Sequence, residues 1–440
     1  MSSGRRFWAP LLLAVLLVPM AAALSGCWSR REINDLAIVS AAAIDWQDGL
    51  YQVTAEIFRP SAGTAGGGMG GGGGGSPLVR EAVLATGSGP DLFSAVRELA
   101  LKVPRRLYWA HATTLLVGEA LARRGIGEVL DFWTRDPEAR TTTLLAVTPG
   151  PAEKLIVQAE PGIERSVGRE VVGLWRTSAA DGHAYLASIH EYRVAAASPV
   201  SAPVVGALTL SPEMQPPLPG RGGAGAGGAV QPLQIVTLRL YGAAVMKHDR
   251  LVGWLTPRET RGWRWLTGRV SSTVLVARCQ DVQRRLRQPG GGQGESDSQT
   301  AAGLSPETTL SFEVVRAWTQ VQAKVQGGKP RIVVRIHAEG TLGAQGCPVD
   351  FTDRRHWDAM QAVMADIIRN DVQQALAKGR ALRADVFQFG EKVHRADPRR
   401  WPQIQRQWDA VFPRLPVEVH VAAYIRRSGM HSWPPASLKP

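Results

Sequence analysis

The stretch DRRHWDAMQAVMADIIRNDVQQALAKG, residues 353–379, decides the fold of the last third of the chain. Its apolar side chains recur every three or four positions, which predicts one long helix that begins near Asp353 and ends at Gly379. A helix with one apolar face needs a sheet or other helices to cover that face. The apolar stripe consists of Trp357, Met360, Met364, Ile367, Ile368, Val372 and Leu376.

The segments on either side of this helix supply the sheet. Residues 417–425 alternate apolar and polar side chains and predict a strand, as do 332–338 and 310–325, the last of which is expected to be bent or broken. A second helix is predicted over 401–412, where large apolar residues are spaced by three or four positions. A sheet with helices on one face, rather than a doubly wound fold, is the simplest packing of this region.

The N-terminal half also mixes strands with helices. A helix is predicted over 91–103, and Pro104 ends it. The segment 61–76 is mostly glycine, which cannot bury apolar area, so it predicts a mobile loop. The predicted strands are 36–44, 51–58, 78–84, 113–117 and 142–147.

We therefore expect an α+β protein with several domains, whose mixed or antiparallel sheets are each packed with helices. The segment 199–231 is rich in Pro, Gly and Ala and is interpreted as a linker or a long excursion, and 288–303 as a second, flexible linker. The remaining parts are a signal peptide at 1–26, an N-terminal α+β domain at 27–198, a middle β-rich domain at 232–287 and a C-terminal α+β domain at 304–432.

The bulk composition limits the classes of partner. The chain has 440 residues, 44% of them hydrophobic, which is enough for more than one folded core. Its formal charge of +13 raises the question of nucleic acid, but the cations occur in short, scattered groups that are typical of solvated faces. We therefore expect no nucleic-acid partner. A basic surface also suits anionic lipid headgroups.

The N-terminus has the pattern of a lipoprotein leader. Arg5 and Arg6 precede an apolar run over 7–23 that carries two prolines and is at the short limit for a membrane span, so a signal peptide is predicted rather than a transmembrane helix. The cysteine that ends the leader is predicted to carry the lipid and to become the first residue of the mature chain, held in the bilayer by two or three acyl chains. The residues that resemble the bacterial lipobox are Leu24, Ser25, Gly26 and Cys27.

Besides the predicted lipid-bearing Cys27, the mature chain has two cysteines, Cys279 and Cys347. The compartment outside the cytoplasm permits disulfides, so this pair is a possible disulfide. Each cysteine also lies near an apolar, strand-like segment, where a buried free thiol is equally well supported. The sequence leaves both alternatives open.

No pattern in the chain indicates catalysis, a metal or a cofactor. The histidines lack zinc-ligand spacing, and His111, next to a predicted strand, is interpreted as a structural residue. The letters GxGxxG occur over 223–228, but with no predicted strand before them and no helix after, so dinucleotide binding is not expected. Most tryptophans are expected in cores. A candidate exposed contact patch beside basic residues is formed by Trp254, Trp263 and Trp265.

Residues 26–39 (GCWSRREINDLAIV) resemble the start of the Ger(x)C spore germination lipoproteins. Four further segments resemble family segments in the same order, so nearly the whole mature chain is covered. These segments are 111–119 (HATTLLVGE), 131–140 (DFWTRDPEAR), 251–268 (LVGWLTPRETRGWRWLTG) and 385–412 (DVFQFG followed by PRRWPQIQRQWDAVF).

The resemblance implies a non-enzymatic C subunit of a spore germinant receptor. The lipid would anchor it to the outer face of the cytoplasmic membrane, which is the inner membrane of the spore, beside the membrane-embedded A and B subunits. The alternative is a lipoprotein that itself binds a small ligand for transport or sensing, which would require a pocket between lobes. An enzyme is the third and weakest class.

The candidate interaction segment directly follows the anchor, where the lipid holds it near any membrane subunit. It carries more charge than a spacer needs, although a solvated tether explains the same composition. Its candidate interaction residues are Trp28, Arg30, Arg31, Glu32 and Asp35.

Overall fold

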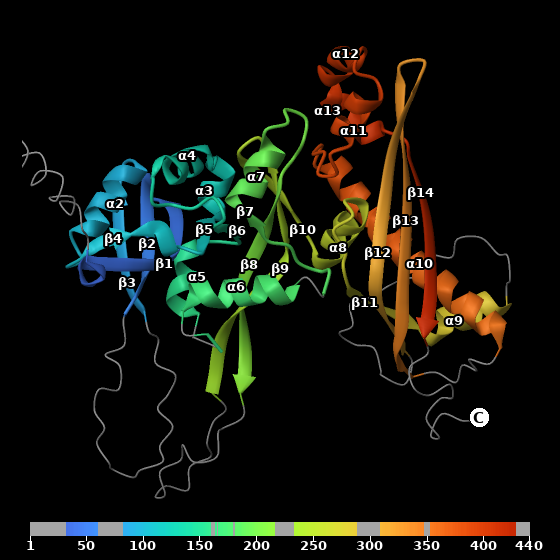
Figure 1. Cartoon of the computed structure of the whole chain (residues 1–440), viewed down its shortest axis with the longest axis horizontal. Coiled ribbons are helices and arrows are strands. Elements are labelled where there is room, and N and C mark those ends of the chain that lie inside the picture. The colour runs from blue at the N-terminus through green and yellow to red at the C-terminus, as the bar shows by residue number, and fades with distance from the viewer. Residues whose placement is uncertain are drawn as a thin grey trace, which may run out of the picture.

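The structure, a computed structural model, describes residues 32–59, 82–159, 163–164, 166–178, 181–215, 233–287, 309–346 and 353–427. Within these ranges the chain forms two lobes, each built on one sheet with helices packed against it (Figure 1). The predicted fold class, α+β with sheets packed with helices, is confirmed. The leader, the Gly-rich segment 61–76 and the predicted linker 288–303 lie outside the described residues.

The sheet of the first lobe has the strand order β10-β9-β8-β6-β5-β1-β2-β3, with β4 beside β1 and β7 beside β6. The central strands β1, β5, β6 and β8 run parallel to their neighbours in this group, and the outer strands are antiparallel, so the sheet is mixed. The strands are β1 (Leu36–Gln47), β2 (Leu50–Phe58), β3 (Ala82–Gly89), β4 (Arg106–Tyr108), β5 (Thr114–Gly118), β6 (Leu144–Thr148), β7 (Ala187–Ser188), β8 (Val204–Gln215), β9 (Leu233–Lys247) and β10 (Arg250–Leu255).

Helices cover both faces of this first sheet. Successive residues of a strand point to opposite faces, so Ala42 and Ile44 of β1 enter one core while Ala41 and Ala43 enter the other. This two-sided burial is why the segment reads as a continuous apolar run in the sequence. One face packs α2 (Leu92–Ala100), α3 (Glu119–Arg124), α4 (Gly127–Arg135) and α7 (Ile189–Ala196), and the other packs α5 (Ala152–Gln158) and α6 (Val167–Ser178).

The second lobe has the strand order β11-β12-β13-β14. Its long strands β12 and β13 form a hairpin, β14 lies parallel to β13, and the long helix α10 packs on one face, behind the sheet in Figure 1. The helix begins where the sequence predicts, and the Asp353 side chain caps it by accepting a hydrogen bond from the Arg355 backbone N–H. The elements are β11 (Thr273–Arg278), α9 (Cys279–Arg287), β12 (Thr309–Gln326), β13 (Lys329–Gln345), α10 (Arg354–Ala381), α11 (Phe389–Ala396), α12 (Trp401–Gln405), α13 (Trp408–Val411) and β14 (Val417–Arg427).

The segments expected as a linker and as a middle domain contribute to both lobes. Within 199–231, residues 204–215 form β8, which pairs with β6 and β9 because its apolar run fits between them. Within 232–287, β9 and β10 complete the first sheet, whereas β11 belongs to the second. The helix α8 (Pro257–Leu266) lies between these strands in the chain and at the junction of the two lobes (Figure 1).

The helix predicted over 401–412 is interrupted, which corrects that prediction. It forms α12 and α13, and the chain leaves helical geometry at Gln407 before a final 3₁₀ turn, η4 (Phe412–Arg414). The break lets Trp401 and Trp408 pack edge to face, with ring centroids 5.6 Å apart. The Trp408 indole N–H also donates to the Asp385 carboxylate, so a tertiary contact accompanies the interruption.

Candidate functional site at the junction of the two lobes

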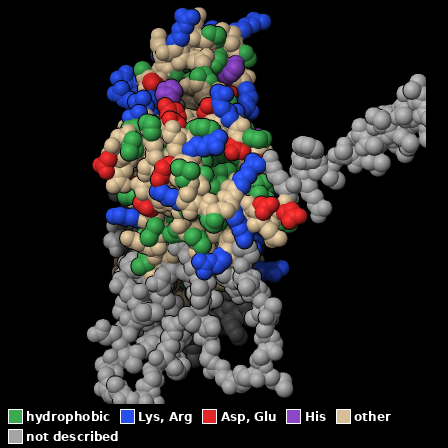
Figure 2. Space-filling model, turned by 90° about the vertical axis from the view of Figure 1, so that its left-hand side faces the viewer, with side chains coloured by type: hydrophobic (Ala, Val, Ile, Leu, Met, Phe, Trp, Pro, Cys, Tyr) green, Lys and Arg blue, Asp and Glu red, His purple; other side chains and the backbone are tan. Residues whose placement is uncertain are grey.

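The predicted anchor and most of the candidate interaction segment lie outside the described residues, namely the stretch from Leu24 through Cys27 to Arg31. Glu32 and Asp35 are described and exposed, at either end of a short 3₁₀ turn, η1 (Ile33–Asp35), that leads into β1. Ile33 is 75% exposed. Figure 2, which views the first lobe end-on, shows acidic and basic side chains interspersed, as the scattered charge of the sequence predicts.

The described residues contain no group of three or more His, Cys, Asp or Glu side chains that could hold a metal ion. In the same part of the chain, none of the helices combines the length and apolar character that crossing a membrane requires. His111 is exposed and its ring lies 5.8 Å from that of Tyr108.

Two buried carboxylates of the first lobe cap helices that lie far away in the chain. The Asp45 oxygens accept hydrogen bonds from the backbone N–H groups of Ala152 and Glu153, both at 2.8 Å, at the start of α5. Glu56 does the same for Val167 and Gly168 at the start of α6. A carboxylate at a helix N-terminus satisfies free N–H groups and the helix dipole. Burial is nevertheless the larger influence at Asp45 and raises its pKa.

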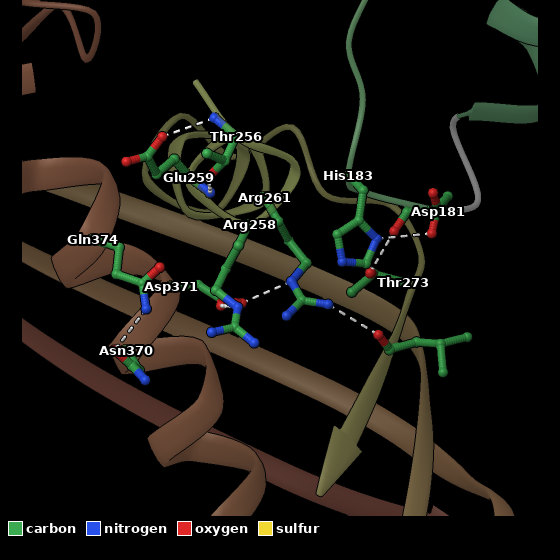
Figure 3. Close-up of polar contacts among 11 residues, drawn as sticks. Asp181, His183, Thr256, Arg258, Glu259, Arg261, Thr273, Asn370, Asp371 and Gln374 are labelled. Atoms are coloured by element: carbon green, nitrogen blue, oxygen red, sulfur yellow. Dashed lines mark hydrogen bonds and ion pairs between the residues drawn. The ribbon is translucent and has the colours of Figure 1, made fainter. Parts of the chain in front are cut away.

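The junction itself is built around α8, which begins with a capping box. The Thr256 hydroxyl accepts from the Glu259 N–H, and the Glu259 carboxylate accepts from the Thr256 N–H (Figure 3). From Thr260 to Leu266 every residue of the helix is buried, including two arginines. Burying a cation costs free energy unless it is paired, so the hydrogen-bond partners of these two arginines show which parts of the protein they join.

Arg261 joins α8 to α10. Its Nε donates to the Asp371 carboxylate at 2.7 Å, and its Nη1 donates to the Val274 carbonyl oxygen at 3.0 Å (Figure 3). The Asp371 side chain is fully buried, and Arg258 approaches its other oxygen to 4.0 Å. Beside this pair, the Thr273 hydroxyl donates to the Asp181 carbonyl, which ties the start of β11 to the first lobe.

Arg264 points from α8 toward the first lobe. Its Nη1 donates to the carbonyl oxygen of Ala184 at 2.9 Å and to that of Ser178 at 3.3 Å. Its Nε and Nη2 donate to the backbone carbonyl oxygen of Arg269. Burial lowers the pKa of the Arg264 guanidinium. Since Arg261 and Arg264 bond to opposite lobes, α8 holds the two lobes together through its side chains.

The tryptophans of α8 are part of this junction, which corrects the prediction of an exposed patch. Trp263 is 4% exposed and donates its indole N–H to the Val386 carbonyl at 2.7 Å, and Trp265 is completely buried. Trp254 on β10 is half-buried. Arg261 and Arg264, basic residues beside these tryptophans, are themselves buried. Their guanidinium groups donate hydrogen bonds to Asp371 and to backbone carbonyl oxygens.

Asp385 forms a second link between the lobes. Its carboxylate accepts the N–H groups of Phe389 and Gly390 at the start of α11 and the indole N–H of Trp408, while its backbone carbonyl accepts the N–H of Ala202 in the first lobe. The side chain is 3% exposed. Burial raises its pKa to about 6 against the lowering effect of these donors.

Next to this link the lobes enclose an open groove of about 610 Å³ between α7 and α11–α12. The Ser198 hydroxyl donates to the Glu391 carboxylate at 2.6 Å across it, and His394 stacks on Trp401 with centroids 5.4 Å apart. Ser198 and Glu391 thus bond to each other across the groove. The arrangement binds one lobe to the other.

Sequence reasoning missed the residues that make the junction, Arg261, Arg264, Asp371 and Asp385. One local signal was available, because Arg261 and Arg264 alternate with the large apolar residues Trp263 and Trp265, beside which cations that become buried need partners. Nothing local identified Asp371 or Asp385 as those partners.

The family described as "Spore germination protein N-terminal domain" matches residues 29–210, and the family "Spore germination B3/ GerAC like, C-terminal" matches residues 241–429. The first match ends within β8 and the second begins within β9, and these two strands are neighbours in one sheet. The two matched segments therefore share the sheet of the first lobe.

Relatives match over nearly their full length. The chain is 28% identical to spore germination protein KC of Bacillus subtilis (strain 168), over 96% of this chain and 97% of that protein. It is 22% identical to spore germination protein B3 of the same organism, over 89% and 91%. Among solved structures, the crystal structure of the GerBC protein aligns with a TM-score of 0.47 and 17% identity, covering 88% of this chain and 96% of that one.

Proposed function

Because this chain belongs to the GerAC-like family of spore germination proteins, we propose that it is the lipid-anchored C subunit of a germinant receptor. It acts without catalysis, through contacts with the A and B membrane subunits of the receptor. The observation that carries the proposal is the match of both family segments, in order, on a chain whose leader ends in a lipobox.

The chemistry of the junction supports a role without catalysis. Its buried charges, Arg261, Arg264, Asp371 and Asp385, bond to each other, to backbone groups or to an indole N–H. Each of these contacts stabilises the fold or joins the lobes. The alternative, capture of a small ligand between the lobes, is less well supported, because the groove is open and Ser198 and Glu391 bond to each other across it.

The anchor defines where the protein works. A lipid on Cys27 holds the chain at the outer face of the cytoplasmic membrane, which is the inner membrane of the spore. Glu32 then lies five positions from the lipid, a reach of at most about 18 Å when extended. The segment 28–35, with Arg30, Arg31 and the exposed Glu32 and Asp35, is therefore a candidate contact with the membrane subunits.

The test compares spores that carry Cys27→Ala with spores that carry Ser29→Ala as the control. We expect Cys27→Ala to release the protein from the membrane or leave it unprocessed, and to impair both germination and recovery of the A and B subunits with the chain. Ser29→Ala should behave as the unaltered chain, because the lipid is kept. A Cys27→Ala chain that stays membrane-bound at the processed size would contradict the lipid anchor.

A further inference from the structure

The sheet of the second lobe has one face that no described element covers. The helix α10 packs on the opposite face, which holds the apolar side chains of β12, β13 and β14 (Figure 1). Along β14 the alternation is regular, with Ala423 and Ile425 buried and Tyr424 and Arg426 outside. We call the outward side the uncovered face; its residues are Arg316, Trp318, Gln320, Gln322 and Lys324 of β12, Arg331, Val333, Arg335, His337 and Glu339 of β13, and Glu418, His420, Ala422, Tyr424 and Arg426 of β14.

Three aromatic rings form a continuous layer across the uncovered face. Trp318 of β12 stacks on His337 of β13, with ring centroids 5.2 Å apart and planes 11° from parallel, and His337 lies 5.0 Å from Tyr424 of β14. Trp318 is 50% exposed and Tyr424 is 39% exposed. Large apolar rings held half in water are unusual for a surface without a partner, and Trp and Tyr dominate the energetics of protein interfaces.

An ion-pair network holds this layer in place. Glu339 accepts hydrogen bonds from Arg426 at 2.8 Å and from His337 at 3.2 Å, and the Arg426 guanidinium also lies over the Tyr424 ring at 5.2 Å. The Arg426 guanidinium, followed by His337, lowers the pKa of Glu339 to about 2. The rings therefore have fixed orientations before any partner arrives, which reduces the entropy lost on binding.

Three cations that lie further along the uncovered face from the aromatic layer lack counter-charges. Lys324 and Arg331 are paired directly across β12 and β13, and both are exposed. Like charges that face each other in a cross-strand pair destabilise a sheet. Arg335 follows on the same strand and face, and none of these three side chains forms an ion pair with a carboxylate in the described part of the chain. The nearby acids are engaged elsewhere, Glu339 with Arg426 and Glu418 with His420.

We propose that the uncovered face is the docking surface for an acidic segment of a protein partner. Carboxylates of the partner lie against Lys324, Arg331 and Arg335, and its apolar side chains pack on Trp318 and Tyr424. Charge complementarity favours this occupant, because the charged side chains of the face that lack an ion-pair partner in the described part of the chain are all cationic. A stacked nucleic-acid base fits less well, since His337 already lies between the two large rings. If the proposed function holds, this partner is one of the two membrane subunits.

The main variant combines Trp318→Ala with Arg331→Glu in the full chain. Its matched control combines Trp175→Ala with Arg176→Glu, which alters an exposed tryptophan and its neighbouring arginine on α6 of the first lobe. Both pairs lie at the surface, so an unchanged melting temperature verifies that each variant folds. Trp318→Phe is a milder second variant that keeps an aromatic ring in the layer.

Two readouts separate this proposal from the proposed function. The first is binding of purified chain to poly-L-glutamate, which the main variant should weaken at least about tenfold while the control and Trp318→Phe stay within about twofold. The second is recovery of the A and B subunits from spore membranes, which only the main variant should lose. If the unaltered chain recovers neither subunit, the receptor role fails, and the poly-L-glutamate result still tests the face.

Three results would overturn the docking surface. One is equal poly-L-glutamate binding by the main variant and the control. Another is that the chain binds phosphatidylglycerol vesicles but not poly-L-glutamate, and that the vesicle binding requires Trp318. This would identify a lipid surface as the occupant. The third is a dimer in sedimentation experiments that the main variant alone abolishes, since the occupant would then be a second copy of the chain.

Discussion

At Gly262 one missing methyl group sets the distance between two helices. A Cβ atom at this position of α8 would lie 2.0 Å from the Asp371 carbonyl oxygen of α10. That oxygen belongs to a helix backbone, which cannot move without shifting α10. The close approach brings Arg261 within hydrogen-bond distance of Asp371.

We expect Gly262→Ala to lower the free energy of unfolding by about 2 kcal/mol or more, because the clash is with backbone rather than with a flexible side chain. Gly173→Ala is the matched control, since this helical glycine of α6 has open space around it. There the better helix propensity of Ala should raise stability by up to about 1 kcal/mol. Urea unfolding of both variants measures the difference, and equal effects would contradict the contact.

Asp385 makes stability depend on pH. Its folded pKa of about 6 lies above the ordinary 3.8, so between these values the folded state binds more protons than the unfolded state. The contribution of this group to folding is therefore most favourable below about pH 4, and it is lost as the pH rises through 6, by about 3 kcal/mol at most.

Asp385→Asn removes the titration. The unfolding free energy of the unaltered chain minus that of this variant should therefore fall from pH 4.5 to pH 7.5. The control, Asp358→Asn, changes a carboxyl of α10 that is 65% exposed, and its difference from the unaltered chain should not change with pH. Urea unfolding at the two pH values gives both differences. A constant difference for Asp385→Asn would show that burial does not shift this carboxyl.

At the residue scale, the predictable features are those whose cause is local. The cap at Asp353 could be recognised because it acts on the backbone two positions away. The roles of Gly262 and Asp385 could not, because the groups that fix them, the Asp371 carbonyl and the Ala202 N–H, are supplied by distant segments.

At the scale of elements, periodicity worked where one face of an element is buried and the other is solvated. The helix α10 and the strand β14 follow the predicted ranges closely. The strand β8 was missed because the high Pro and Gly content of its surroundings concealed the apolar run over 204–210. Gly206 within it is needed for packing, since a Cβ there would lie 2.5 Å from the Tyr185 carbonyl oxygen.

The adjacent ends of β11, β12 and β13 suggest which cysteine is the disulfide partner of Cys279. Cys279, the first residue of α9, is disulfide-bonded, and Cys347 lies outside the described residues. Arg278 pairs with Thr309, and the Gly346 N–H donates to the Thr309 carbonyl at 2.8 Å. The two cysteines thus directly follow residues that flank Thr309 on either side. We expect them to pair with each other.

Peptide mapping without reductant should recover the two cysteines in one linked fragment. Cys347→Ser should lower stability by about 4 kcal/mol, the loop-closure value for a crosslink of this span. Adding reductant to the unaltered chain should have a similar effect, and adding it to Cys347→Ser should have little. A linked fragment that joins Cys279 to Cys27 instead would contradict the pairing.

At the scale of the whole molecule, the fold class followed from the alternation of strand and helix patterns, but the division into lobes did not. Composition placed a boundary at the Pro/Gly-rich segment 199–231, whereas the chain crosses between the lobes after β10. Hydrogen bonding between β8 and β9 keeps both strands in the first lobe, and local composition does not predict such pairing. The junction was unpredictable for the same reason, since α8 takes its partners from both lobes.

The position of α8 in the chain also determines when the protein finishes folding. Arg261 bonds to a residue 110 positions later, and Trp263 bonds to one 123 positions later. A chain that emerges N-terminus first thus exposes a helix that is buried from Thr260 to Leu266 in the folded protein long before the partners of that helix exist. Contacts between such distant segments form slowly, and the waiting intermediate is prone to aggregate. Protection of the nascent chain until its last third has appeared is therefore a requirement that this architecture imposes on the cell that makes it.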